Sequence, residues 1–245
     1  MTFLKISSRA PKTFSKEKTK AKTDLLKAQI SDYQKILYAE GKRSLLIILQ
    51  GVDASGKDGL VADVFNGLNP LGVSVSAFKA PSTLERSHDF LWRIHAATPA
   101  SGMIHIFNRS HYEDILVPTV EKYVDEKALQ KRYTDINNFE AMLQNNGIVI
   151  LKFYLHISRE EQSVRLKERK TNPKKFWKHN DDDWKTRRKW DSYMAVYESI
   201  FKKCSVPQWT IVPSDQNWYK EYVVAEKVCD ALSRMKLKYP TLTKK

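Results

Sequence analysis

The sequence predicts an α/β protein built on one parallel sheet of five strands, with helices on both faces. Short apolar runs, such as residues 148–156, alternate along the chain with segments whose apolar residues recur at helical spacing. Continuously apolar strands separated by helices indicate a parallel sheet that is covered on both sides. We therefore expect a single domain over residues 1–245, folded as three α/β/α layers.

The individual elements follow from local patterns. Residues 1–24 are rich in lysine, so we expect a flexible basic arm there. From residue 24 to residue 40, apolar side chains recur at helical spacing before Gly41, which predicts a helix whose apolar face packs on the sheet or forms an interface. The expected strands cover residues 45–50, 73–78, 103–108, 148–156 and 209–212. The expected helices begin at Lys57 and then cover residues 82–95, 125–145, 158–169, 182–203 and 215–235.

The first strand leads into a loop with the spacing of a phosphate-binding loop. Gly51, Gly56 and Lys57 match G-x-x-x-x-G-K, with a strand before and a helix after. Such a loop brings several backbone N–H groups onto a phosphate, while the helix adds its positive end and the lysine a mobile cation. The candidate phosphate-binding residues of this loop are Gly51, Ala54, Ser55, Gly56, Lys57, Asp58 and Gly59.

One position of the loop departs from the usual pattern. Asp58 follows the lysine, where Ser or Thr normally binds magnesium through its hydroxyl. A metal ligand must then come from a carboxylate, and Asp53 stands inside the loop where a phosphate-bridging metal would lie. The dipole of the following helix alone is a sufficient reason for an acidic Asp58.

Polar residues also follow the second and third strands. Ligands of such sheets bind at the carboxyl ends of the strands, so we expect these residues to converge on the loop. Arg109 is suited to phosphate because its planar fork binds two oxygens, although an ordinary ion pair with Asp114 is the alternative. Asp114 is also the second candidate metal ligand. The further candidate substrate-binding residues here are Lys79, Arg93, Asn108 and Glu113.

A basic segment follows the fourth strand, where nucleotide kinases carry a lid that excludes water on closing. Arg165 and Arg169 lie four residues apart and therefore share a helical face. Further basic residues continue this surface: Lys170, Lys174, Lys175 and Lys178. A solvated helix face is the simpler explanation of such a run, but its position favours a lid within residues 158–182. In such a lid, Arg165, Arg169 and Lys170 are the candidate substrate-binding residues, with the two arginines on the transferring phosphates.

The formal net charge of +14 indicates a polyanionic partner, because it attracts nucleic acid, anionic lipid, nucleotide or polyphosphate. The apolar runs are too short for the ~20 residues of a membrane span, and the first residues show no secretion signal. Cys204 and Cys229 are too few and too far apart to indicate a zinc site or a disulfide framework. We therefore expect a cytoplasmic protein with reduced thiols.

Several separated motifs resemble those of polyphosphate kinase family 2 over about residues 25–232. The motifs are GVDASGKDG, FKAPS, HDFLWRIH, IFNRSHYEDILV, RRKWDSYMAVYE and WTIVPSDQNWYK. The resemblance implies a P-loop kinase-like fold with a helical lid, and reversible phosphoryl transfer between inorganic polyphosphate and nucleotides. It also implies a modified Walker A motif, G-x-D-x-x-G-K-x-G, in which Asp53 is essential and binds metal or the accepting phosphate.

The resemblance also suggests substrates. Where the family often has Asp-Arg-Ser, this chain has Asn108, Arg109 and Ser110 followed by HYED, which is similar to the subclass that phosphorylates both nucleoside monophosphates and diphosphates. Glu113 is then the candidate for accommodating a monophosphate acceptor. The implied substrates are polyphosphate, AMP, ADP and ATP, with guanine nucleotides as further candidates, and the implied cofactor is Mg²⁺, with Mn²⁺ as a substitute. We expect a homo-oligomer, no membrane and no nucleic acid.

Two other functions are also compatible with parts of this sequence. The first is an ATP-dependent nucleotide kinase of thymidylate-kinase-like fold, which would share the loop, lid and sheet. Such a kinase would not need the long basic segment, and it would normally have a hydroxyl residue after Lys57. A basic polynucleotide-binding module would leave Asp53 and Asp114 unexplained, since carboxylates repel a phosphate backbone.

Overall fold

The structure, a computed structural model, describes residues 3–242 and has the predicted parallel sheet. The strands lie in the order β2-β3-β1-β4-β5, and every neighbouring pair is parallel. They are β1 (Ser44–Gln50), β2 (Val73–Ala77), β3 (Ile104–Asn108), β4 (Ile148–His156) and β5 (Trp209–Pro213). All the predicted strands are confirmed, with no end displaced by more than one residue.

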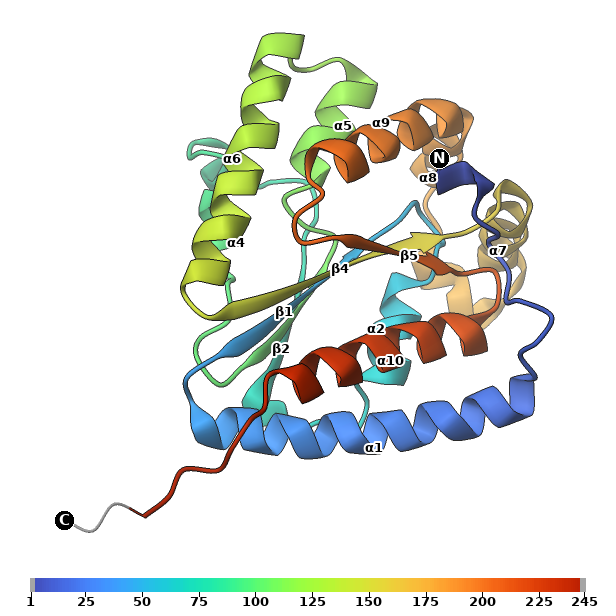
Figure 1. Cartoon of the computed structure of the whole chain (residues 1–245). Coiled ribbons are helices and arrows are strands. Elements are labelled where there is room, and N and C mark those ends of the chain that lie inside the picture. The colour runs from blue at the N-terminus through green and yellow to red at the C-terminus, as the bar shows by residue number, and fades with distance from the viewer. Residues whose placement is uncertain (1–2, 243–245) are drawn as a thin grey trace.

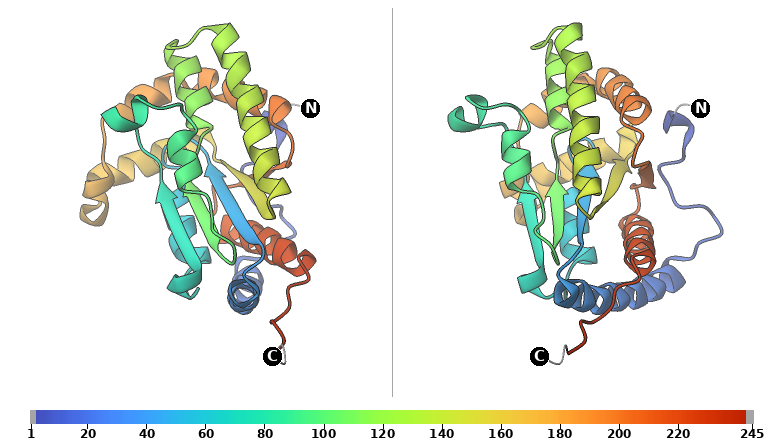
Figure 2. Two further views of the ribbon diagram at one scale, coloured as in Figure 1. Left: turned by 90° about the vertical axis from the view of Figure 1, so that its left-hand side faces the viewer. Right: turned by 60° about the vertical axis from the view of Figure 1, so that its left-hand side comes forward.

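Helices cover both faces of this sheet (Figures 1 and 2). One face is covered by α1 (Lys16–Glu40), α2 (Lys57–Val64) and α10 (Asn217–Arg234). The opposite face is covered by α4 (Trp92–Ala96), α5 (Glu113–Glu121), α6 (Glu126–Asn145) and α9 (Trp190–Lys203). The chain also forms α3 (Thr83–Arg86), α7 (Arg159–Thr171) and α8 (Asp182–Arg188), and short 3-10 turns at Phe3–Lys5, Pro70–Gly72 and Pro173–Lys178. The structure thus has the three predicted layers.

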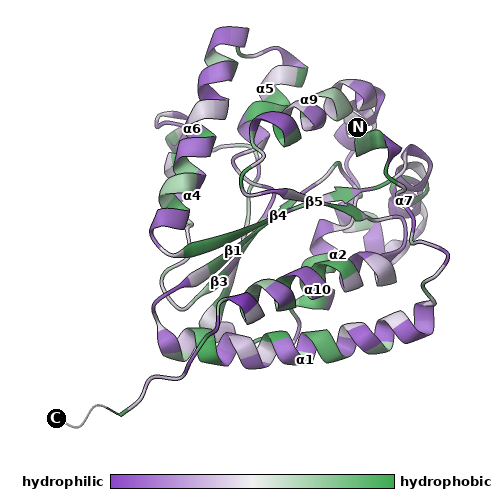
Figure 3. Cartoon of the chain, viewed as in Figure 1, coloured by the Kyte–Doolittle hydropathy of each residue, from purple (hydrophilic) through white to green (hydrophobic). Residues whose placement is uncertain are grey.

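The central strand separates two apolar cores. Leu45 and Ile47 of β1 face α1 and α10, whereas Leu46 and Ile48 face α6 and α9. All of β1 is buried because successive side chains of a strand point to opposite faces, and both faces are covered. Figure 3 shows the hydrophobic central strands and the more polar outer surfaces of α1 and α6. The sheet therefore provides a rigid base for the loops at its carboxyl end.

The predicted flexible arm over residues 1–24 is wrong over its described part. α1 begins at Lys16, capped by the Ser15 hydroxyl, rather than at Asp24. Upstream of it, Phe3 is buried against Tyr154 in the core. Lys16, Lys18, Lys20 and Lys22 lie on the exposed side of α1, which explains why the pattern was mistaken for a solvated arm. Residues 1–2 lie outside the described residues.

The helices after the third strand were predicted less well. α5 was not predicted, because it contains Pro118, which cannot donate to the carbonyl of Asp114. Arg132 of α6 donates to that carbonyl instead, so the helix continues through the proline. The predicted helix 82–95 is two short helices, α3 and α4, and the predicted helix 182–203 is α8 and α9, which meet at Lys189.

None of the helices in residues 3–242 is both long enough and apolar enough to cross a membrane.

Candidate active site

The predicted phosphate-binding loop connects β1 to α2 in a conformation that requires glycine at both ends. Gly51 has φ 151°, and a Cβ there would lie 2.8 Å from the Ser55 hydroxyl. Gly56 has φ 95°, and a Cβ there would lie 2.5 Å from Lys220 Nζ. Ala54 is also left-handed, at φ 61°. At Gly59, by contrast, the nearest atom that a Cβ would meet is Asp63 Oδ2 at 3.8 Å, so packing within the chain does not require glycine.

Lys57 is folded back onto its own loop. Its ammonium donates to the carbonyls of Gly51 over 2.6 Å and Val52 over 3.3 Å. Burial and the nearby Arg109 guanidinium lower the pKa of Lys57 to about 8. An anion in the loop would offer this ammonium a partner of opposite charge in place of neutral carbonyls.

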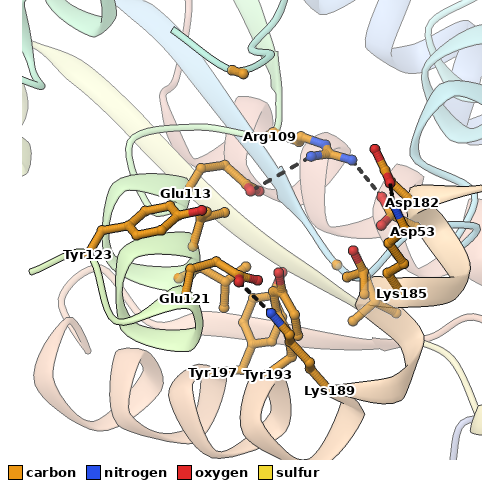
Figure 4. Close-up of a pocket in the computed structure, with 16 residues that line it drawn as sticks. Asp53, Arg109, Glu113, Glu121, Tyr123, Asp182, Lys185, Lys189, Tyr193 and Tyr197 are labelled. Carbon is orange, nitrogen blue, oxygen red and sulfur yellow. Dashed lines mark hydrogen bonds and ion pairs between the residues drawn. The ribbon is translucent and has the colours of Figure 1, made fainter. Parts of the chain in front are cut away.

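Arg109 connects the loop to the segment after β3. Its guanidinium lies 2.6 Å from the Asp53 carboxylate and 3.8 Å from the Glu113 carboxylate (Figure 4). Burial opposes the charge on Arg109, but Glu113 and Asp53 outweigh it and raise the pKa of the guanidinium. Burial raises the pKa of Glu113. The predicted convergence of the first and third loops is therefore present, and Asp53 rather than Asp114 is the ion-pair partner of Arg109.

A cavity of about 560 Å³ opens beside this ion-pair chain. Asp53, Arg109 and Glu113 line one side, and tyrosines of the α5 exit and α9 line the other (Figure 4). Lys189 pairs with Glu121 across the floor. Tyr193 and Tyr197 of this lining belong to the RRKWDSYMAVYE motif, which was the available signal for them. The remaining polar side chains belong to segments with ordinary helical or loop patterns and were not predicted: Tyr123, Asp182, Lys185 and Thr186.

Asp114 and Arg93 form a separate group outside this cavity lining. The Asp114 carboxylate lies 3.5 Å from Arg93, and Arg93 also donates to the carbonyl of Lys79 over 2.8 Å. Burial raises the pKa of Asp114, against the attraction of Arg93 and Arg132. Lys79 itself is exposed to solvent. Arg93 thus links α4 to α5 and to the loop after β2.

Asn108 and Asp58 contact each other at the other side of the loop. The Asn108 amide donates to Asp58 over 2.8 Å, and Lys178 lies 3.3 Å from the second Asp58 oxygen. Burial opposes the charge on Asp58, but the Asn108 amide and the Lys178 ammonium outweigh it and lower the pKa of Asp58. Asp58 thereby connects α2 to the basic segment after α7.

The basic cover, as we call the segment predicted to contain the lid, consists of α7, the 3-10 turn Pro173–Lys178 and α8, and its arginines are bound within the protein. Arg165 donates to the carbonyls of Ala54 and Ser55 and of two residues after β5. Arg169 lies 2.5 Å from Asp183 and thereby ties α7 to α8. Lys170 is exposed, 3.4 Å from Asp181.

Two loop-binding residues were missed by the sequence interpretation. Gln162 of α7 donates to the carbonyl of Asp53 over 3.0 Å, and Lys220 of α10 donates to that of Gly56 over 3.1 Å. Each side chain is only 1% exposed. Burial and the Arg165 guanidinium lower the pKa of Lys220 to about 8. Lys220 lies in the WTIVPSDQNWYK motif, so a buried cation within a motif was the available signal.

The carboxylates near the loop differ in how well they suit a divalent metal. Within residues 3–242, no group of three or more His, Cys, Asp or Glu side chains is arranged to hold a metal ion. Mg²⁺ in phosphoryl-transfer sites usually takes one or two carboxylates, with substrate oxygens and waters completing its shell. Asp53, whose carboxylate lines the cavity at the loop, fits that requirement, whereas Asp114 is held by Arg93 elsewhere.

Comparisons with known proteins agree with this geometry. The family model described as Polyphosphate kinase 2 matches residues 13–240. The chain is 43% identical to the AMP/ADP-polyphosphate phosphotransferase of Meiothermus ruber, over 88% of this chain and 82% of that protein. It is 37% identical to the ADP-polyphosphate phosphotransferase of Rhodopseudomonas palustris, over 90% of this chain and 82% of that protein.

A solved structure agrees over the whole fold. The crystal structure of Polyphosphate Kinase 2 from Arthrobacter aurescens TC1 superimposes with a TM-score of 0.95 at 36% identity, covering 100% of this chain and 89% of that chain. This agreement covers the whole chain and therefore includes the helices that carry the loop-binding residues. The chain belongs to the polyphosphate kinase 2 family.

Proposed function

We propose that this protein transfers the terminal phosphoryl group of inorganic polyphosphate to AMP or ADP, and that it runs in reverse when nucleoside triphosphate is abundant. The observation that carries the proposal is Arg109, which lies between Asp53 of the phosphate-binding loop and Glu113 at the mouth of the cavity. Membership of the polyphosphate kinase 2 family and the names of the relatives support the choice of donor and acceptors.

The reaction joins two anions, so the main task of the protein is to position and neutralise them. The P–O bond between the last two phosphates of the polymer breaks, and a P–O bond forms to a terminal oxygen of AMP or ADP. Loop amides and Lys57 bind the phosphates undergoing transfer. Arg109 exchanges its carboxylate partners for the oxygens of the transferring group, whose charge it stabilises in the transition state.

The cavity next to Arg109 is the proposed acceptor site. Tyr193 offers aromatic surface to a base, while Lys185 offers a cation to the phosphates. Glu113 lies between Arg109 and the cavity, in keeping with a role in accommodating AMP. Purine preference is not determined by these residues, so guanine nucleotides remain candidate acceptors.

We assign Mg²⁺ to the Asp53 carboxylate, with Mn²⁺ as a substitute. When bound, the ion would neutralise negative charge on phosphate oxygens. The Asp53 carboxylate that would hold it lies 2.6 Å from Arg109 in this structure, so binding a metal would compete with this ion pair. Arg109 would then be available to bind phosphate.

The basic cover is the proposed binding surface for the rest of the polymer. Lys174 and the 77% exposed Trp177 lie on it, and Lys79 is exposed after β2. Polyphosphate carries about one negative charge per phosphate, so an extended lysine track suits it better than a single nucleotide does. Arg165 and Arg169 are bound by groups of the protein, which contradicts their expected contact with the transferring group.

An assay for product formation tests the proposal. Polyphosphate of defined length is incubated with ADP or AMP and magnesium, and the nucleotides are resolved by chromatography over time. The proposal requires that ADP is converted to ATP, and that AMP is converted first to ADP and then to ATP. No product should form when EDTA is present. Absence of ATP with folded protein and either acceptor would refute it.

We further propose a homo-oligomer in the cytoplasm. α1 packs its inner face on α10 and the sheet but leaves Leu25 68% and Tyr38 49% exposed, which suits a partner copy. Light scattering coupled to size exclusion gives the mass directly, and a monomer of 28.5 kDa would contradict the oligomer. The buried free thiols Cys204 and Cys229 agree with a reducing compartment.

A further inference from the structure

The carbonyl oxygens of the phosphate-binding loop are all bound by side chains. The Lys57 ammonium donates hydrogen bonds to the first two of these carbonyls, those of Gly51 and Val52. The other partners come from α7 and α10, which lie outside it. Gln162 binds Asp53 O at 3.0 Å, Arg165 binds Ala54 O at 3.2 Å and Ser55 O at 3.1 Å, and Lys220 binds Gly56 O at 3.1 Å.

These outer partners are themselves held in place. Gln162 and Lys220 are 1% exposed, and Lys220 also donates to Asn217 Oδ1 at 3.1 Å. The second terminal nitrogen of Arg165 donates to the carbonyls of Ser214 at 2.7 Å and Asp215 at 3.0 Å. The loop is thus fastened to the end of β5 as well as to two helices.

The loop conformation depends on this support. Ala54 lies in the left-handed region at φ 61°, which is unfavourable for a residue with a side chain and persists only where the surroundings enforce it. A Cβ at Gly56 would lie 2.5 Å from Lys220 Nζ, so the missing side chain makes room for the lysine. The glycine and the buried lysine therefore form one structural unit.

We propose that Gln162, Arg165 and Lys220 are positioning residues, an outer clamp that fixes the loop carbonyls and thereby aims the loop amides at the reacting phosphates. In a trans peptide the C=O and the following N–H point in opposite directions, so carbonyls drawn to the outer helices turn the next amides toward the inner side. Two cations on the carbonyl side also raise the positive potential felt by an anion there. The inference rests on the proposed function.

The clamp also has a consequence for the lid. The side chains that hold the loop belong to the first two turns of α7, Gln162 and Arg165. That part of the helix is then part of the phosphate site and stays in place. Any closure of the cover must involve residues beyond Arg165.

Isothermal titration calorimetry with tripolyphosphate and with AMP, both with magnesium, tests the clamp on the full-length protein. Lys220→Met removes the charged donor at nearly unchanged volume, and Gln162→Met removes a neutral one. Lys227→Met, at an exposed position of the same helix, is the matched control. Loss of a hydrogen bond from a charged group predicts roughly tenfold or more weaker tripolyphosphate binding for Lys220→Met, and about threefold for Gln162→Met.

The two ligands separate positioning from general loss of structure. AMP binding should change by less than about twofold in both variants, because none of the three clamp residues lines the acceptor cavity. In contrast, kcat should fall with tripolyphosphate affinity. Unchanged tripolyphosphate binding in folded Lys220→Met, or equal weakening of both ligands, would overturn the clamp. If Lys220→Met does not fold, Gln162→Met decides by the same criteria. Wild-type protein that binds tripolyphosphate but makes no ATP would refute the proposed function and leave the clamp to be judged by binding.

Discussion

Asp53 makes two separate contacts, one through its side chain and one through its backbone carbonyl. Its carboxylate neutralises Arg109 at 2.6 Å, while its carbonyl is held by Gln162. The backbone therefore stays in place when the side chain changes partner. Under the proposed metal assignment, this division would let a loop that lacks the usual hydroxyl after Lys57 present an oxygen ligand without moving its backbone.

Asp53→Asn should lower kcat by at least two orders of magnitude, the scale of losing a principal electrostatic group from such a site. The change keeps the size of the side chain but removes the charge that pairs with Arg109 or a metal. Initial rates of ATP formation from polyphosphate and ADP measure it. Asp230→Asn, at an exposed position of α10, serves as the control, and a rate for Asp53→Asn within tenfold of wild type would contradict the assignment.

The titration of Lys57 predicts a pH limit. Its pKa of about 8 in the free protein means that the ammonium is protonated below that pH and neutral above it, so kcat/KM for polyphosphate should fall above pH 8. Lys220 has a similar pKa, so the decline should be between tenfold and a hundredfold per pH unit. kcat should stay level to higher pH, because bound phosphate raises both pKa values. A kcat/KM that is flat to pH 9.5 would be incompatible with these roles.

A buried ionic cluster connects several elements behind the site. Lys152 of β4 lies 2.7 Å from Glu140 of α6, and Glu140 also accepts from the Tyr112 hydroxyl at 2.8 Å and contacts His111 at 3.1 Å. His111 and Tyr112 belong to the turn between β3 and α5, only a few positions after Arg109. The cluster therefore anchors the turn that presents Arg109 and Glu113.

Lys152→Met should reduce the free energy of unfolding by about 3–5 kcal/mol, because it leaves the Glu140 charge buried without its main cation. The double change Lys152→Met with Glu140→Leu should recover much of that loss, since no unpaired charge remains. Urea unfolding followed by circular dichroism measures both. Additive losses in the double variant would mean that the pair does not act as a unit.

Sequence patterns predicted the elements that depend on local chemistry. Strand ends and the P-loop followed from apolar runs, glycine spacing and Lys57, and all proved accurate. α5 was missed because its stability depends on Arg132, a partner that only the fold supplies. The sequence shows that Arg165 shares a helical face with Arg169, and from this we predicted that it binds substrate. It binds four carbonyls instead, and these belong to segments distant in sequence, so the pattern could not reveal them. Lys220 was missed for the same reason.

At the scale of the whole molecule, the formal net charge of +14 serves binding more than folding. The logarithm of a polyanion's binding constant falls with the logarithm of the salt concentration, with a slope of about −0.7 for each phosphate neutralised on a single strand. If the basic cover neutralises about four phosphates, KM for polyphosphate should therefore rise roughly 50-fold between 50 and 200 mM salt. KM for AMP should change far less, because it contacts fewer cations. A KM for polyphosphate that is independent of salt would show that the lysine track does not bind the polymer.

The most direct test of the account is a comparison of donors with AMP as the common acceptor. Wild-type protein and magnesium are supplied with either polyphosphate or ATP at equal concentration of transferable phosphoryl groups, and formation of ADP from labelled AMP is followed by chromatography. Polyphosphate should be the better donor by at least tenfold in kcat/KM, because only a polymer engages both the loop and the basic cover. A faster reaction with ATP, and none with polyphosphate, would identify an ordinary nucleotide kinase instead.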